Sequence, residues 1–347
     1  MKKIEFLKKK LLTILLVLSM TVLSLAGCGN TKTDNSGSDN VKLTTINEAV
    51  MTGQFDYYTT IIGKWQGIFE KHGIDLQTTE YVAGIYTIDA IVNGTATIGM
   101  MANYAAVNRL GNTLHDTDLV MFSEMGGGGS NQNGGLYVAP EYIDNLEALD
   151  GSAGFITQVG TVNDYYAWKC MEYLGLDPDK QNLVNIDSSA TGLAVVLNNE
   201  ASAYYTSGSQ AAKVEEYGWK LAFSATELNL IAGSYFLTTE KYYEENQELL
   251  VEWMLAIQES FDYISANLEE CGDYLEDNYG VDKQVFVSNY KSMISKVGFS
   301  QEGADSLAEM EQWCYEHGRF EEDFDITQFI RTEVAEKAMP NQTTYKK

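Results

Sequence analysis

Histidine and cysteine, which often bind metal ions or act in catalysis, are few in this sequence and stand in no recognisable motif for either role. The histidines stand singly, without an H-E-x-x-H or comparable metal spacing; they are His72, His115 and His317. Beyond Cys28, the cysteines are odd in number and form no C-x-x-C pair, so at most one disulfide is possible; they are Cys170, Cys271 and Cys314. No Ser/His/Asp or Cys/His order indicates a nucleophile, and Cys170 is the residue that an enzyme hypothesis would test first. We therefore expect no cofactor and no metal ion, and we predict that the chain is not an enzyme.

Aromatic and polar side chains instead gather where predicted strands end. Ligands of open α/β sheets bind beyond the carboxyl ends of strands, so we predict that these residues contact a ligand. Tyrosine offers a flat apolar face and a hydroxyl, which suits planar or cationic organic molecules, although packing is the commoner role of a single tyrosine. The predicted contacts are Gln54, Asp56, Tyr57, Gly84, Tyr86, Asn103 and Tyr104 in the first half of the chain, and Gly160, Thr161, Asn163, Tyr165, Tyr204 and Tyr205 in the second.

Two of these positions have a second explanation. Thr161 is a predicted helix N-cap with Asp164 three residues on, a capping-box arrangement. The free amides of that helix start could bind an anionic ligand group, whereas Asp164 opposes any anion. Asp56 stands at a predicted helix start, where the dipole favours an acidic side chain whether or not it contacts a ligand amine. The sequence leaves both alternatives open.

Alternating strands and helices position these residues and predict an α/β fold. The first long helix carries apolar side chains at helical spacing and stops at Gly73. Beyond residue 246 the chain is predicted to be nearly all helical to about residue 337. The predicted strands are residues 42–50, 74–82, 96–101, 118–125, 136–139, 152–158, 183–187, 201–207 and 233–239; predicted helices include residues 55–73, 84–94, 103–111, 143–151, 162–175 and 191–199.

The glycine-rich stretch MGGGGSNQNGGLYVA, residues 125–139, divides the β/α pattern in two. It lacks the lysine of a phosphate loop and runs into a strand rather than opening a helix, which disfavours nucleotide binding. Glycine absorbs hinge motion at little steric cost, so we interpret the stretch as a crossover between two lobes, with a plain linker as the alternative. The C-terminal helices have no sheet of their own and must return to the first lobe. The predicted division is residues 41–127 plus 235–347 for lobe 1 and 128–234 for lobe 2, with hinge crossovers near 125–138 and 231–238.

The N-terminal residues predict export and a lipid anchor. Lysines precede an apolar run at residues 11–26, which is too short for a comfortable membrane span and is typical of a signal peptide. The run ends in LAGC, the lipobox pattern of bacterial lipoproteins, in which Cys28 takes the lipid. We predict a signal peptide at residues 1–27, a polar tether at 28–40, and a location at the extracytoplasmic face of the bacterial membrane. An ordinary secretory peptide with an incidental cysteine is the alternative.

Charge narrows the choice of ligand. The formal charge is −26, so the surface repels nucleic acid. The sequence holds only three arginines, Arg109, Arg319 and Arg331, so an arginine-clamped polyanion is a poor candidate for the ligand.

Four stretches together resemble one known family: the substrate-binding proteins of nitrate, taurine and sulfonate-type ABC importers, with the related thiamine-pyrimidine binders. The stretches are GKWQGIFEKHGIDLQ, AGIYTIDAIVNGTATIGM, LEALDGSAGFITQVGT and YLGLDP, within roughly residues 43–270. The resemblance implies a type II periplasmic-binding-protein fold, in which each of two lobes is an open, mainly parallel sheet flanked by helices, followed by a helical C-terminal tail. Ala201 and Ser202 depart from the family pattern, and no cysteine-rich pyrimidine motif is present, so thiamine-precursor specificity does not carry over.

From this resemblance we expect a lipid-anchored protein that traps a small organic solute between its lobes and delivers it to an ABC permease with its ATPase. Ligand binding would shift an equilibrium between open and closed forms. Few arginines and many tyrosines favour a neutral, zwitterionic or cationic aromatic solute over nitrate or sulfonate. The alternatives are a bilobal enzyme related to pyrimidine-precursor synthesis and a ligand-sensing lipoprotein without a permease.

Overall fold

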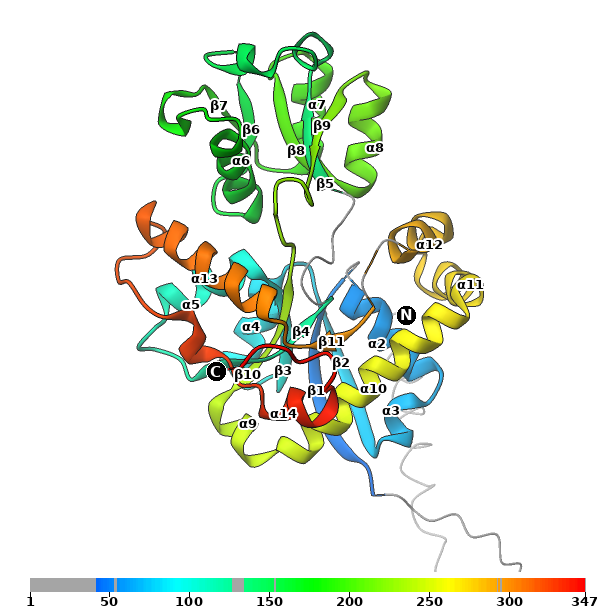
Figure 1. Cartoon of the computed structure of the whole chain (residues 1–347). Helices are drawn as coiled ribbons and strands as arrows, with labels where there is room; N and C mark the ends of the chain where they lie inside the picture. Colours follow the sequence, from blue (N-terminus) through cyan, green and yellow to red (C-terminus); the bar gives the residue numbers. More distant parts are fainter. Residues whose placement is uncertain are drawn as a thin grey trace, which may run out of the picture. The chain divides into compact units, whose positions relative to one another are not determined.

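Two β-sheets, each with helices packed against it, make up this computed structural model (Figure 1). The larger sheet has six strands in the order β11-β4-β10-β3-β1-β2, and the smaller has five in the order β7-β6-β8-β5-β9. The predicted α/β fold is confirmed. The structure describes residues 42–52, 55–126, 134–152, 154–291, 293 and 295–346.

Several predictions fall on residues outside this described part. They are the signal peptide at residues 1–27, the lipidated Cys28, the tether at 28–40, the ligand contact Gln54 and residues 127–133 of the glycine-rich stretch.

The six-stranded sheet is built from both ends of the described chain. β1 pairs in parallel with β2 and β3, as repeated βα units require, whereas β10 runs antiparallel between β3 and β4. The chain that follows the five-stranded sheet therefore returns to complete the six-stranded one. The strands are β1 Thr44–Met51, β2 Ile74–Tyr81, β3 Ile98–Ala102, β4 Leu119–Met125, β10 Ser234–Thr239 and β11 Val297–Gly298.

Helices cover both faces of this sheet. Successive strand residues point to opposite faces, and the apolar side chains on each face pack against helices. In β10, Phe236 packs with Trp253 on the face under α2, α10 and α14, whereas Tyr235 and Leu237 join the core under α4, α5 and α13. We call this sheet and its helices the six-stranded part. Its helices are α2 Phe55–Trp65, α3 Ile68–Lys71, α4 Gly84–Val92, α5 Asn103–Asn112, α9 Glu240–Glu245, α10 Gln247–Ala266, α11 Leu268–Tyr279, α12 Lys283–Lys291, α13 Gln301–Glu316 and α14 Glu333–Ala338, with a 3-10 turn at η4 Ile326–Phe329.

The five-stranded part, β5 to β9 with its helices, has a smaller core around Ile156, Tyr204 and Trp219. Glycine is required on β5 because a Cβ at Gly135 would lie 2.4 Å from the carbonyl oxygen of Phe223 on the next strand. The elements are β5 Gly134–Val138, β6 Phe155–Thr157, β7 Leu183–Asn185, β8 Ala203–Ser207, β9 Lys220–Ser224, α6 Val162–Tyr173, α7 Ser189–Leu197 and α8 Gly208–Glu216, with 3-10 turns at η1 Pro140–Tyr142, η2 Leu146–Leu149 and η3 Pro178–Lys180.

Three predicted elements differ from the structure. The helix predicted at residues 143–151 is the 3-10 turn η2. The helix predicted at 55–73 is two helices, because Gly67 adopts a left-handed conformation with φ 69° between α2 and α3. The edge strand β9 was not predicted.

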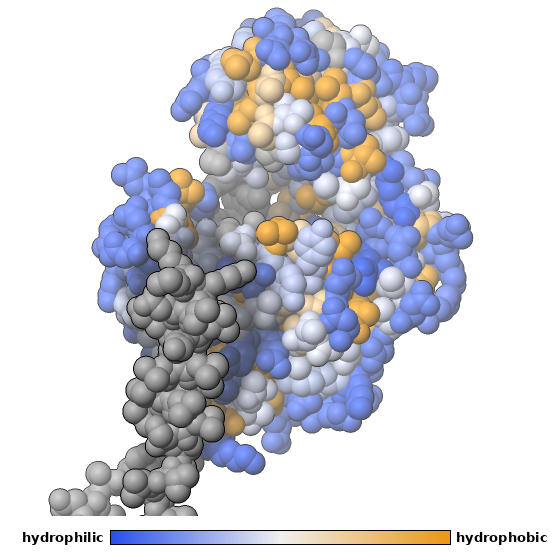
Figure 2. Space-filling view, turned by 180° about the vertical axis from the view of Figure 1, so that it is seen from behind, coloured by the Kyte–Doolittle hydropathy of each residue, from blue (hydrophilic) through white to orange (hydrophobic). Residues whose placement is uncertain are grey.

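The surface is mainly hydrophilic on the face drawn in Figure 2, where apolar residues group largely on the five-stranded part. Within the described ranges, no helix combines the length and apolar character needed to cross a bilayer.

Candidate functional site

The parallel strands bring several predicted ligand contacts to helix starts. β1, β2 and β3 lead into α2, α4 and α5, and β6, β7 and β8 lead into α6, α7 and α8. Gly84 and Asn103 are the first residues of α4 and α5, and Asp56 is the second residue of α2. Thr161 is the N-cap of α6, and its side-chain oxygen accepts a hydrogen bond from the Asn163 amide. This is the edge at which open α/β sheets bind ligands.

Asp56, at the start of α2, is one of two buried acidic residues whose charges interact; the other is Glu48 on β1. Asp56 Oδ2 accepts a hydrogen bond from the Met51 amide at 3.1 Å, whereas its buried Oδ1 has no partner in the described part of the chain. Burial raises the pKa of Asp56 to about 7. Glu48, buried on β1, accepts hydrogen bonds from Thr60 at 3.4 Å, and burial together with the Asp56 charge raises its pKa to about 8.

Tyr57 packs within the six-stranded part. Its hydroxyl donates to Glu80 at 3.5 Å, and its ring meets Tyr58 and Tyr279 edge to face at 5.6 and 6.2 Å. Burial, followed by the charge of Glu80, raises the pKa of Tyr57 to about 12. In this conformation its ring serves packing.

The start of α4 is open to solvent. A Cβ at Gly84 would lie 3.0 Å from that of Met101, so glycine allows α4 to approach β3 closely. Tyr86 is 49% exposed, beside exposed Val82 and Ile85. Of the predicted contacts, Tyr86 is the aromatic ring most open to a solute.

Asn103 and Tyr166 hold the segment that connects β9 to β10. Asn103 Nδ2 donates to the carbonyl oxygen of Ile231 at 2.8 Å, and the Tyr166 hydroxyl donates to the same oxygen at 3.1 Å. Tyr104 is buried, and its hydroxyl has no partner among the described residues. Asn103 of the six-stranded part and Tyr166 of the five-stranded part are therefore joined through one backbone carbonyl, that of Ile231.

The first turns of α6 pack against α13 and against Arg319, which lies just beyond the end of α13. Asp164 is 1% exposed; its Oδ1 accepts from Thr157 Oγ1 at 2.9 Å and its Oδ2 from Arg319 Nη2 at 2.5 Å. Tyr165 meets Trp313 edge to face at 5.3 Å, and the Arg319 guanidinium lies over the same Trp313 ring at 5.5 Å. The capping role of Thr161 is observed, whereas Asp164 is held by side chains rather than by the helix start.

The remaining predicted contacts separate by exposure. Gly160 is exposed and Asn163 is half-buried, with its side chain 3.3 Å from Gln158. Tyr204 and Tyr205 are buried on β8, where Tyr205 packs against Tyr166 at 4.6 Å. None of these observations tests a ligand contact, so the full set stays a prediction.

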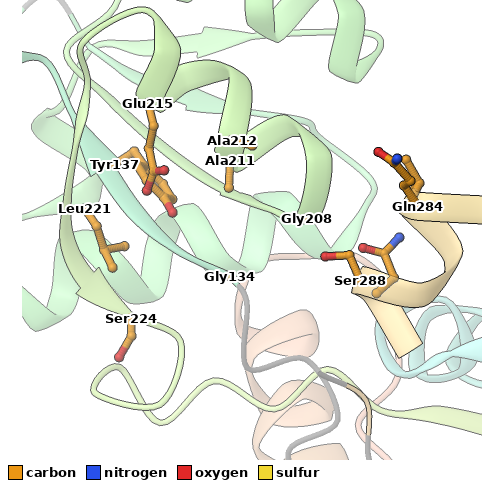
Figure 3. Close-up of a pocket in the computed structure, with 12 residues that line it drawn as sticks. Gly134, Tyr137, Gly208, Ala211, Ala212, Glu215, Leu221, Ser224, Gln284 and Ser288 are labelled. Carbon is orange, nitrogen blue, oxygen red and sulfur yellow. The ribbon is translucent and has the colours of Figure 1, made fainter. Parts of the chain in front are cut away.

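A cavity of about 520 Å³ lies between β5, α8, β9 and α12 (Figure 3). Pockets for small molecules commonly enclose about 300–1,000 Å³. Small residues of α8 make room for it, and Figure 3 shows Tyr137 and Glu215 side by side on one wall, with Gln284 and Ser288 on α12 opposite. The lining residues are Gly134, Tyr137, Gly208, Ala211, Ala212, Glu215, Leu221, Ser224, Gln284, Val285, Ser288 and Asn289.

The sequence interpretation named none of these lining residues as contacts. The strand-end rule, by which ligands bind beyond the carboxyl ends of strands, points to Gly208, which follows β8 directly, and could have identified it. No local signal marks Gln284 or Ser288, because α12 reaches the cavity from a distant part of the chain.

Comparison with known proteins identifies the family. The model of the family described as NMT1/THI5 like matches residues 54–271. The chain belongs to the NMT1/THI5-like family. The resemblance drawn from the sequence motifs is thereby confirmed. No curated protein matches the sequence.

Solved structures share the fold of this NMT1/THI5-like chain. The periplasmic aliphatic sulphonate binding protein SsuA of Escherichia coli is 17% identical, with a TM-score of 0.71 over 82% of this chain and 97% of that one. The periplasmic nitrate-binding protein NrtA of Synechocystis PCC 6803 is 14% identical, with a TM-score of 0.62 over 87% of this chain and 91% of that one. A Candida albicans protein described as having the generic periplasmic binding protein structural fold is 10% identical, with a TM-score of 0.59 over 84% of this chain and 97% of that one. The predicted periplasmic-binding-protein fold is confirmed.

Two features of this NMT1/THI5-like chain bear on catalysis. Across the residues that the structure covers, no group of three or more His, Cys, Asp or Glu side chains could hold a metal ion. Cys170 is fully buried, and burial raises the pKa of its thiol well above the ordinary value. Nucleophilic cysteines need an accessible thiolate, so Cys170 is a poor nucleophile.

Proposed function

We propose that this protein is a lipid-anchored, extracytoplasmic solute-binding protein that captures a small organic molecule and delivers it to an ABC importer. The observation that carries the proposal is the periplasmic-binding-protein fold shared with a sulphonate binding protein and a nitrate-binding protein over more than four-fifths of this chain. Two α/β parts, a carboxyl-edge set of helix starts and a cavity of suitable volume fit that role.

Delivery to an importer draws support from the fold relatives. One is the ligand binding component of an ABC-type import system from Staphylococcus aureus, which is 9% identical with a TM-score of 0.62. For the present chain, the partners of the proposal are a permease and its ATPase. A ligand-sensing lipoprotein would share the fold and would lack these partners, so an adjacent gene pair encoding them distinguishes the two roles.

The lipid anchor rests on the LAGC motif that ends at Cys28. The Cys28→Ala variant should lose acyl labelling by radioactive palmitate and should leave the membrane fraction, because the thiol is the attachment point. A Cys170→Ala variant serves as the matched control and should keep both label and membrane attachment. Equal labelling of wild type and Cys28→Ala would remove the anchor from the proposal.

Solute binding is tested by thermal unfolding of the full-length protein in mild detergent. The compounds are taurine, alkanesulfonates, nitrate, thiamine precursors, amino acids, polyamines and aromatic nutrients. A ligand at one hundred times its Kd adds about 2.7 kcal/mol to the free energy of unfolding, which raises the midpoint by several degrees. One chemical class should raise the midpoint, whereas a flat response to every class would argue for a sensor of another kind of ligand.

A further inference from the structure

The cavity between α8 and α12 has an unusual charge distribution for a protein whose fold relatives bind sulphonate or nitrate. Among its twelve lining residues, Glu215 is the only charged side chain, and none is Lys, Arg or His. An anion placed there would meet a carboxylate and no cation. A cation would gain a counter-ion.

The arginines of the chain are engaged elsewhere. Arg109 pairs with Asp89 at 2.8 Å, Arg319 pairs with Asp164 at 2.5 Å, and Arg331 pairs with Glu240. Each guanidinium therefore already has a carboxylate partner, whereas a bidentate clamp on a sulfonate or carboxylate ligand needs one that is available.

Tyr137 and Glu215 form the polar wall of this cavity. Figure 3 shows the Tyr137 hydroxyl beside the Glu215 carboxylate, and burial followed by the Glu215 charge raises the pKa of Tyr137 to about 12. The hydroxyl therefore stays protonated at neutral pH and is placed to donate to the carboxylate of Glu215, an exposed side chain that lines the cavity. Glu215 also lies in the last turn of α8, where the helix dipole favours a cation.

The other walls of the cavity suit the apolar part of an organic ligand. Leu221 and Val285 are exposed large apolar side chains on facing elements, 45% and 46% exposed, and a ligand between them would remove apolar surface from water. The Ser224 hydroxyl already donates a hydrogen bond to Glu227 at 2.7 Å. The other polar side chains that could bind a ligand therefore lie mainly on α12.

We propose that this cavity binds a small organic ammonium ion, with Glu215 as its counter-ion and Tyr137 fixing the carboxylate. The proposal deepens the solute-binding function above and rests on it. The negative charge of the whole chain, −26, acts in the same direction by attracting cations over a longer range.

Calorimetric titration of the full-length protein in mild detergent separates head-group charge from shape. The probes are tyramine, phenethylamine, agmatine, putrescine and choline, each compared with an alcohol or carboxylate of the same carbon skeleton. An ammonium probe should bind, and its matched carboxylate should bind at least tenfold more weakly. The Glu215→Gln variant should weaken ammonium binding by about 10- to 100-fold, because a hydrogen-bonded charge partner is lost.

Three further variants make the test specific. Glu216→Gln changes the neighbouring exposed carboxylate, which does not line the cavity, and should leave affinity unchanged. Tyr137→Phe should weaken binding less than Glu215→Gln does. Ala212→Lys places a positive charge in the cavity and should weaken ammonium binding by 100-fold or more.

The outcomes distinguish this proposal from the proposed function. Binding of a carboxylate, sulfonate or neutral probe without any ammonium probe overturns the ammonium assignment and leaves solute binding intact. Unchanged ammonium affinity in Glu215→Gln or in Ala212→Lys overturns the assignment of the site. No binding by any probe, charged or neutral, counts against both proposals.

Discussion

Glu48 on β1 and Asp56 in the first turn of α2 are two buried carboxyl groups with raised pKa values. Burial raises their pKa values to about 8 and about 7, from ordinary values of 4.5 and 3.8. At pH values between the ordinary and the raised pKa of each group, the folded chain holds more protons than the unfolded chain. The free energy of unfolding therefore falls as pH rises. The contribution of each group to the free energy of unfolding is fully present below the pKa that the group has in the unfolded chain. It is lost as pH rises through the pKa that the group has in the folded chain.

Glu48→Gln should reduce this pH dependence, because glutamine stays neutral at the same buried position. The fall in unfolding free energy from pH 5 to pH 8 should shrink by roughly 2–4 kcal/mol, since one pKa unit corresponds to about 1.4 kcal/mol. Urea unfolding at pH 5, 6.5 and 8 measures the difference. The exposed Glu216→Gln is the control and should follow the wild type. The same slope in Glu48→Gln and wild type would show that Glu48 is ionised throughout.

Single-residue predictions from sequence were limited by side-chain direction. The strand-end rule located the helix starts of Asp56, Gly84 and Asn103, because it depends only on chain order and parallel pairing. It could not tell that Tyr57 and Tyr165 point into packed aromatic clusters. Those directions depend on α11 and α13, which lie more than 100 residues further along the chain.

At the scale of elements, α6 and α13 join the five-stranded part to the six-stranded part. Lys169 on α6 pairs with Glu309 on α13 at 2.8 Å, Tyr165 packs on Trp313, and Arg319 reaches the buried Asp164. An aromatic core flanked by ion pairs makes this a specific contact. These contacts orient α6 against α13.

Arg319→Ala should destabilise the protein by about 2 kcal/mol, since it leaves Asp164 buried without its charged partner; exposure of Arg319 keeps the loss below that of a fully buried pair. Arg109→Ala is the matched control, because it breaks an Arg–Asp pair whose aspartate is 45% exposed, and it should cost less than about 1 kcal/mol. Denaturant unfolding midpoints give both values. Equal losses in the two variants would contradict a special role for the Arg319 contact.

Element predictions succeeded where a strand is buried along its whole length or a glycine ends a helix. The buried strands β3 and β4 and the Gly73 stop were predicted from apolar runs and glycine alone. β9 was missed because an edge strand buries little and shows weak alternation. The return of β10 between β3 and β4 follows from topology that no local pattern carries.

The whole molecule combines the fold of periplasmic binding proteins with a strong negative charge. The fold was predicted through family motifs, and the family match over residues 54–271 confirms it. The cavity between α8 and α12 was not predicted, because it forms from segments far apart in sequence. The function that we propose at this scale is the capture of a small solute by the folded chain.

Capture can be measured directly, without prior choice of a ligand. The full-length protein in mild detergent is incubated with growth medium and washed, and the small molecules released on denaturation are identified by mass spectrometry. We expect one enriched low-mass organic compound that is bound by the folded protein and absent from a heat-unfolded control. An eluate indistinguishable from that control, after exposure to the medium in which the protein is made, would contradict solute binding.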